Sequence, residues 1–144
     1  MMRLVLAVLA YLVPTFALGF VWHLVLFEPY YDALAIYRSD IIIPFGFLSM
    51  LIQAVIFAWI YKKGFAQREG TFLARALSYG ALGAVLSWSF TTLAVAAKNM
   101  MASVPDYLLI ETGFTIVQWI IVGPLTALAF RQLARRDEQV RVAG

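Results

Sequence analysis

The chain has 144 residues, of which 63% are hydrophobic and only 13% carry a charge. So much apolar surface exceeds what a small water-soluble domain can bury, which indicates a membrane protein. Contacts with lipid headgroups explain the net charge of +3, so that charge does not indicate nucleic-acid binding. The absence of cysteine excludes disulfides, a thiolate nucleophile and a cysteine-ligated metal centre.

Long apolar segments follow one another along the chain, separated by short polar connections. A helix of about 20 apolar residues spans the hydrocarbon of a bilayer, and continuous apolar runs favour helices over strands. We therefore predict an all-α integral membrane bundle of four transmembrane helices within a single membrane domain, residues 1–136. A basic, flexible tail is expected over residues 137–144. The predicted helices cover about residues 4–27, 41–61, 72–97 and 104–131.

Two helix starts carry capping signals. Thr71 precedes the third segment as an N-cap, and Ser103 stands three residues before Asp106 in the spacing of a capping box. The first segment could instead be a cleaved signal peptide, because a basic start and an apolar core precede small residues. Its apolar run continues to Phe27, however, which is longer than a signal core and favours a retained helix.

The lysines and arginines predict the orientation of the bundle. Only Arg38 and Lys98 fall on one side of the four predicted helices. Cationic segments stay in the cytoplasm, so both termini are predicted to be inside and the two longer connections outside. The cytoplasmic side then holds the other nine basic residues: Arg3, Lys62, Lys63, Arg68, Arg75, Arg131, Arg135, Arg136 and Arg141.

One pair of ionisable residues is placed at a similar depth in two different helices. His23, the only histidine, lies about one turn inside the outer end of helix 1, and Glu111 lies near the outer end of helix 4. With Trp22 and Glu28 close by, they are candidates for a ligand-binding site that holds a proton, a cation or a polar headgroup. An interhelical contact near the headgroups is the simpler interpretation of the same residues.

Polar and small residues deeper in the helices are candidates for packing. Gln53 and Gln118 fall near the middle of their helices, where we expect structural hydrogen bonds, with a polar step in a transport path as the alternative. Gly80, Gly83 and Ser87 lie on small-residue rows of helix 3. Such rows allow close helix packing, either within the bundle or against a protein partner.

No motif indicates a reaction. A single histidine with scattered carboxylates lacks the ligand spacing of a metal site, and no catalytic triad or phosphate-binding loop occurs. We therefore expect no metal, no cofactor and no catalytic residue, while acid–base chemistry by His23 and Glu111 stays formally open.

Two stretches carry a resemblance to a known family. Residues 18–31 (LGFVWHLVLFEPYY) combine a glycine and an aromatic near the end of helix 1 with an aromatic-rich outer loop. Residues 111–123 (ETGFTIVQWIIVG) open with glycine and an aromatic and have a later glycine. Together they resemble a family of small bacterial four-helix membrane proteins without an assigned activity. The resemblance implies that architecture and a bacterial cytoplasmic membrane.

These observations lead to three functional expectations. The first is a non-enzymatic accessory or binding protein that docks to a membrane partner or holds an apolar or headgroup-bearing ligand near the outer leaflet. The second is an oligomeric transporter or channel for ions or small solutes, and the third is a membrane enzyme of lipid chemistry. The expected partners are membrane lipids and either further copies of the chain or a larger membrane complex, with no nucleic acid.

Overall fold

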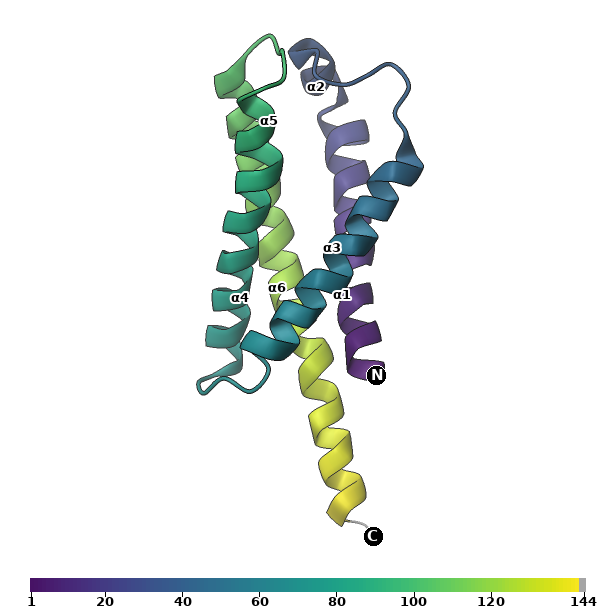
Figure 1. Ribbon diagram of the computed structural model, residues 1–144, viewed down its shortest axis with the longest axis vertical. Coiled ribbons are helices and arrows are strands. Elements are labelled where there is room, and N and C mark those ends of the chain that lie inside the picture. The colour runs from purple at the N-terminus through teal and green to yellow at the C-terminus, as the bar shows by residue number, and fades with distance from the viewer. Residues whose placement is uncertain (143–144) are drawn as a thin grey trace.

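The computed structural model describes the backbone of residues 1–142 and the side chains of residues 1–131 (Figure 1). All regular secondary structure in this part of the chain is helical, and it contains no strand. Several of the longer helices are continued by short π-helical or α-helical segments. The elements in chain order are α1 (Met2–Val21), η1 (Trp22–Leu26), α2 (Glu28–Leu34), α3 (Ile43–Gly64), α4 (Phe72–Ser87), η2 (Trp88–Leu93), α5 (Ala94–Ala96) and α6 (Val104–Val142).

Four helical stretches are long and apolar enough to cross a membrane, which confirms the predicted fold class. Large apolar side chains cover the outside of the bundle, as expected where lipid rather than water surrounds a protein. The chain is therefore an all-α, multi-pass membrane protein. The spans are Met2–Leu26, Ile43–Gly64, Phe72–Ala96 and Val104–Arg131.

The helix ends differ from the predicted ones by a few residues, except at the last helix. The Thr71 hydroxyl accepts a hydrogen bond from the Ala74 N–H at 3.2 Å, which confirms the predicted N-cap. The last helix continues to Val142, so helical backbone extends into the expected tail. Side chains of residues 132–144 lie outside the described residues, and the flexible tail at 137–144 stays a prediction.

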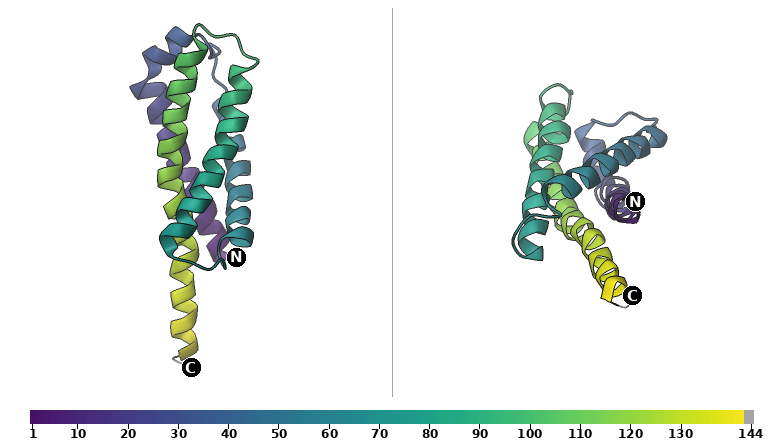
Figure 2. Two further views of the ribbon diagram at one scale, coloured as in Figure 1. Left: turned by 90° about the vertical axis from the view of Figure 1, so that its left-hand side faces the viewer. Right: turned by 60° about the horizontal axis from the view of Figure 1, so that its bottom comes forward.

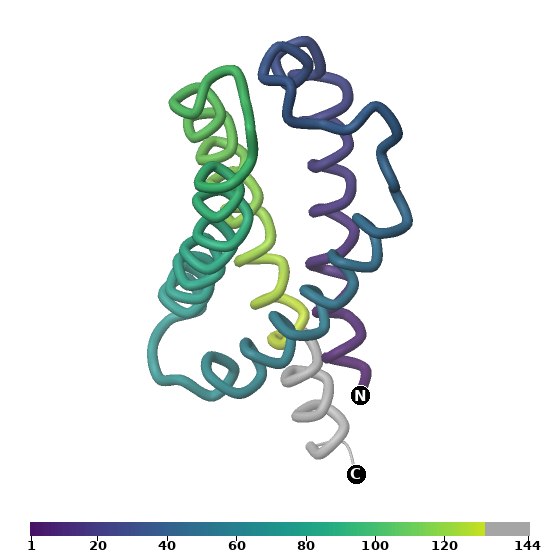
Figure 3. Tube along the Cα trace, turned by 45° about the horizontal axis from the view of Figure 1, so that its top comes forward, coloured from purple at the N-terminus to yellow at the C-terminus, as the bar shows by residue number. Residues whose placement is uncertain are grey.

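Helix α6 is the centre of the bundle, because both α1 and α4 pack along it (Figures 1 and 2). Helix α3 packs mainly across α1 and has few contacts with α6. The connection at residues 65–71 joins α3 to α4 at the end of the bundle that also holds both chain termini, here called the terminal end (Figure 3). From there the two helices diverge towards the opposite end, here called the α2 end.

Aromatic side chains fill the core between the helices. Phe57 of α3 lies edge-on to Trp119 of α6, with ring centroids 4.8 Å apart, and Tyr11 of α1 stacks on Phe57 at 5.5 Å. Nearer the terminal end, Tyr61 meets Tyr79 in a T-shaped contact at 5.0 Å. Offset and edge-on ring pairs of this kind are favourable beyond the area that they bury. They join all four spans around α6.

The contact between α4 and α6 depends on glycine. A Cβ atom at Gly83 would lie 2.2–2.4 Å from the indole ring of Trp119, and one at Gly80 would lie 3.3 Å from the Trp119 carbonyl. Trp119 is only 3% exposed, and its Nε1 donates to Ser87 Oγ at 3.0 Å, so the ring has no room to move aside. Gly123, the later glycine of residues 111–123, lies against Gly80 from the α6 side.

We expect Gly83→Ala to destabilise the protein by about 1–3 kcal/mol, because the new methyl group overpacks a site closed by the Trp119 ring. Gly46→Ala is the matched control, since nothing lies within 4 Å of a Cβ atom at that position. It should be neutral or slightly stabilising. Unfolding of each purified variant in mixed micelles with increasing sodium dodecyl sulfate, followed by circular dichroism, measures the difference. Equal stability of the two variants would contradict the close contact between α4 and α6.

Candidate functional site

The α2 end of helix α1 is wound as a π-helix, and this segment carries His23. The wider turn of η1 follows directly after α1. His23 Nδ1 lies 2.9 Å from the carbonyl oxygen of Gly19, four residues earlier. π-helical turns are rare and often occur at functional sites, where they re-aim a side chain. Here the turn and the Gly19 carbonyl together fix the orientation of the imidazole ring.

His23 and Glu111 meet across the bundle. His23 Nε2 lies 3.1 Å from Glu111 Oε1, and the Tyr31 hydroxyl donates to the same oxygen at 2.5 Å. Glu111 is only 8% exposed, so its carboxyl group depends on these partners rather than on water. The cluster of His23, Tyr31 and Glu111 joins η1, α2 and α6, and we call it the α2-end cluster.

Aromatic rings enclose the α2-end cluster. The ring of Phe114 lies 4.6 Å from the His23 ring, centroid to centroid, and the Tyr31 ring lies 4.8 Å from it. Tyr37 stacks on Tyr31 at 5.2 Å. These walls lower the local dielectric around Glu111, which strengthens each hydrogen bond to the carboxyl group.

The two stacked tyrosines remain neutral over the working pH range. Burial raises the pKa of Tyr31, and the neighbouring Glu111 carboxyl raises it further. Burial followed by the charge of Glu111 likewise raises the pKa of Tyr37. Because both shifts are upward from an ordinary value of about 10, the Tyr31 hydroxyl keeps its proton and donates at any pH below that value.

The other two ligand-binding candidates have different positions. Trp22 forms part of the wall, with its ring 4.7 Å from Phe27, and its buried Nε1 has no hydrogen-bond partner among the described residues. Glu28 starts α2 on the surface and makes no hydrogen bond or ion pair with the described part of the chain. Tyr31 and Phe114 were not among the predicted ligand-binding candidates, although Tyr31 is close to His23 in sequence. The signal for Tyr31 was its place in an aromatic-rich segment beside His23. The signal for Phe114 was its place one helical turn after Glu111.

Gln53 and Gln118 bond to separate partners rather than to each other. Gln53 Oε1 accepts from the Tyr11 hydroxyl at 2.7 Å, and Gln53 Nε2 donates to Ser49 Oγ at 3.1 Å. Gln118 Nε2 donates to Thr15 Oγ1 at 3.2 Å. These bonds link α1 to α3 and to α6, as interhelical hydrogen bonds do in membranes.

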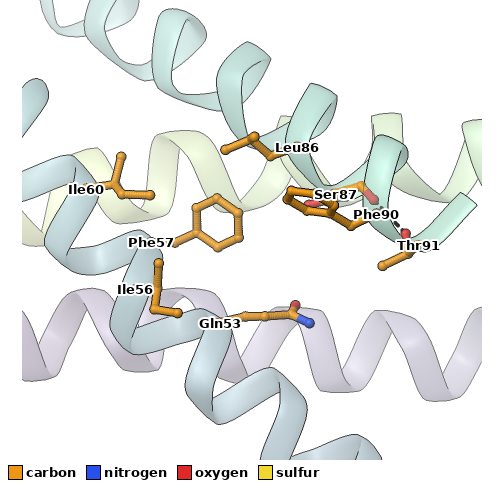
Figure 4. Close-up of a pocket in the computed structure, with 8 residues that line it drawn as sticks. All are labelled: Gln53, Ile56, Phe57, Ile60, Leu86, Ser87, Phe90 and Thr91. Carbon is orange, nitrogen blue, oxygen red and sulfur yellow. Dashed lines mark hydrogen bonds between the residues drawn. The ribbon is translucent and has the colours of Figure 1, made fainter. Parts of the chain in front are cut away.

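A groove with a volume of about 200 Å³ lies between α3 and α4 with η2. Figure 4 shows side chains of the two helices facing each other across it, with the Phe57 ring between them. Phe57 is backed by the buried Trp119 ring, which gives the groove a rigid floor. The lining residues are Gln53, Ile56, Phe57, Ile60, Leu86, Ser87, Phe90 and Thr91.

Across residues 1–131, no three metal-ligating side chains come together. No family model, no curated protein and no solved structure matches the chain. The resemblance to small bacterial membrane proteins therefore gains no support from these comparisons, and the structure agrees with it only in having four apolar helices long enough to cross a membrane.

We expect Tyr31→Phe to destabilise the protein by about 1–3 kcal/mol, because it removes a donor from a buried carboxyl group. Tyr30→Phe is the matched control, since the neighbouring Tyr30 is exposed and its hydroxyl makes no hydrogen bond with the described residues. Thermal unfolding of the two variants in the same detergent, followed by near-ultraviolet circular dichroism, gives the comparison. A loss of the same size in Tyr30→Phe would argue against a specific bond to Glu111.

Proposed function

We propose that this protein is a non-enzymatic binding protein of the membrane that holds the hydrocarbon chain of an amphipathic ligand in the groove between α3 and α4. The observation that carries the proposal is a groove whose polar side chains are already hydrogen-bonded within the protein and whose remaining lining is apolar.

The hydrogen bonds of the lining residues favour an apolar occupant. Gln53 bonds to Tyr11 and Ser49, as described above. Ser87 Oγ accepts from Trp119 Nε1, and the Thr91 hydroxyl donates to the Ser87 carbonyl at 2.8 Å. A polar ligand would leave its own hydration shell and find few open partners here, whereas a hydrocarbon chain needs none.

Exposed apolar residues at the rims of the groove support entry of the ligand from the surrounding lipid. Ile56 on α3 is 51% exposed and Phe90 on η2 is 72% exposed, and both lie within spans that cross the hydrocarbon. The groove thus opens towards lipid rather than towards either aqueous phase. Because α3 makes few contacts with α6, it could admit a chain without disturbing the contact between α4 and α6.

The groove lies at a level of the bilayer where the end of a lipid hydrocarbon chain would be, rather than its headgroup. Gln53 lies ten residues after Ile43, the first residue of α3, which is about 15 Å at a rise of 1.5 Å per residue. That places it near the middle of the hydrocarbon layer. The ligand class is therefore a lipid or another amphiphile whose apolar part reaches the bilayer centre.

The proposal includes an orientation and a location. Among the described residues, the terminal end of the bundle carries Lys62, Lys63, Arg68 and Arg75, whereas the α2 end carries only Arg38 and Lys98. The excess of basic residues supports a cytoplasmic terminal end with both termini inside. The resemblance noted in the sequence supports a bacterial cytoplasmic membrane. Gly80 and Gly83, candidates for contact with a partner, pack against α6 of the same chain and so lend no support to docking.

We expect Leu86→Trp to reduce ligand retention by about fivefold or more, because overfilling a packed site costs about 1–3 kcal/mol. Native mass spectrometry of protein extracted gently from its own membrane measures the fraction that keeps one lipid adduct.

Val85→Trp is the matched control, because Val85 is the preceding residue of α4 and does not line the groove. It should retain the adduct as the wild type does. If the wild type carried no adduct, or if both tryptophan variants lost it equally, the groove would not be the binding site.

The orientation can be tested separately, because the chain has no cysteine of its own. We expect a membrane-impermeant maleimide added to intact cells to label Ser39→Cys at the α2 end and not Gln67→Cys at the terminal end. Both positions are exposed, and permeabilised cells should label both. The reverse pattern would overturn the predicted orientation.

A further inference from the structure

We propose that the ligand of the groove is a phospholipid from the leaflet at the α2 end, with the end of one chain against Phe57 and its phosphate beside Lys98. This inference rests on the proposed function, because it names the orientation and the headgroup of the ligand held there. The groove is closed towards the terminal end and open towards the α2 end, where a free cation follows it.

Aromatic side chains close the groove towards the terminal end. Tyr79 of α4 meets Tyr61 and Phe65 of α3, with ring centroids 5.0 and 5.5 Å apart. The Tyr79 hydroxyl donates to the Phe57 carbonyl oxygen at 3.2 Å, which ties α4 to the turn of α3 that carries the floor of the groove. All three rings are buried. A hydrocarbon chain in the groove therefore stops at these rings.

The other end of the groove is open. Residues 43–49 of α3 are all exposed, as α3 and α4 diverge towards the α2 end (Figure 1). Gly46 and Ser49 lie seven and four residues before Gln53, and so on the same side of α3 as this lining residue. A Cβ atom at Gly46 would have nothing within 4 Å. A chain that ends at Phe57 can therefore run along α3 to a headgroup at the α2 end.

Lys98 is a free cation at that end. Arg38, the other basic residue there, donates through Nε and Nη2 to the Asp40 carboxylate at 3.0 and 3.1 Å, so its charge is already balanced. Lys98 is exposed, and its side chain makes no hydrogen bond or ion pair within residues 1–131. Its backbone N–H donates to the Val95 carbonyl oxygen, which holds it in the helical turn after α5. A lysine in this position extends its ammonium group to the interface, where it attracts lipid phosphate.

The spacing between Lys98 and the groove fits one lipid chain. Lys98 follows the lining residue Thr91 by seven residues, so both lie on nearly the same side of the helix, about two turns apart. Leu86, the lining residue of α4 nearest the terminal end, lies twelve residues before Lys98, which is about 18 Å at a rise of 1.5 Å per residue. Half of the hydrocarbon layer is about 15 Å thick. A phosphate at Lys98 thus brings the end of its chain to the level of Leu86.

Entry from the opposite leaflet has less support, although the terminal end carries more basic residues. Lys62 and Lys63 follow the groove on α3, but the buried rings of Tyr61 and Tyr79 lie between these lysines and the groove. A lipid with its phosphate at the terminal end would need to part these rings and break the hydrogen bond to the Phe57 carbonyl.

A comparison of two lipids with the same chains tests the phosphate contact. Full-length protein is offered equal amounts of phosphatidylethanolamine and diacylglycerol, and native mass spectrometry counts each adduct. We expect the wild type to retain about fivefold more phosphatidylethanolamine, and Lys98→Gln to retain the two lipids about equally. Lys62→Gln is the matched control and should keep the preference. Equal retention by the wild type, or loss of the preference in Lys62→Gln alone, would overturn the contact with Lys98.

Photocrosslinking tests the orientation of the lipid. Nanodiscs contain phosphatidylethanolamine with a diazirine either at the end of its chain or next to its ester, and mass spectrometry locates the label. Label that is present in the wild type and absent from Leu86→Trp belongs to the groove, and Val85→Trp should keep it. We expect chain-end label on residues 53–60 and ester-proximal label on residues 43–49 or 94–99.

The outcomes separate this inference from the proposed function. Ester-proximal groove label on residues 61–65 or 72–79 would show entry from the terminal end, so the orientation would be wrong while the groove remained a lipid site. If Leu86→Trp removed no label, the groove would hold no lipid, and both the proposed function and this inference would fail.

Discussion

In the hydrocarbon of a bilayer, a polar group that finds no partner inside the protein finds none at all, and this constraint shapes the whole bundle. It explains why the described chain is helical, since each helix satisfies its own backbone. It also explains where the helices touch. His23 bonds to Glu111, Gln53 to Tyr11 and Gln118 to Thr15, so each of these polar pairs ties one span to another.

Helix α6 takes part both in the close glycine contact with α4 and in the hydrogen bonds of the α2-end cluster. Trp119 fills the space that Gly83 leaves open on α4, and Glu111 contacts His23 of η1 and accepts a hydrogen bond from Tyr31 of α2. Helix α3 stands apart from this arrangement, because it packs mainly on α1. The separation of α3 from α4 creates the groove. The same helix arrangement therefore explains both the close packing around α6 and the one side of the bundle that is open to lipid.

The α2-end cluster and the groove lie at different levels of the bundle. The α2-end cluster is polar, enclosed by aromatic rings and near one end of the spans, whereas the groove is apolar and near their middle. Each is bordered by a π-helical segment, η1 at the cluster and η2 at the groove. The wider π-helical turns therefore occur where the His23 side chain is oriented towards Glu111 and where α3 and α4 diverge.

The sequence by itself determined the number of spans, their approximate limits and the Thr71 cap, because hydropathy and capping are local properties of a segment. It also placed His23 and Glu111 at similar depth, since depth follows from residue number along a straight helix. Only the tertiary structure decided that these two meet, that Tyr31 joins them, and that Gln53 and Gln118 have separate partners. It also decided that Gly80 and Gly83 face α6 within the chain. The physical reason is that a contact depends on how each helix is rotated and which helix lies next to it, and neither is encoded in the hydropathy of one segment.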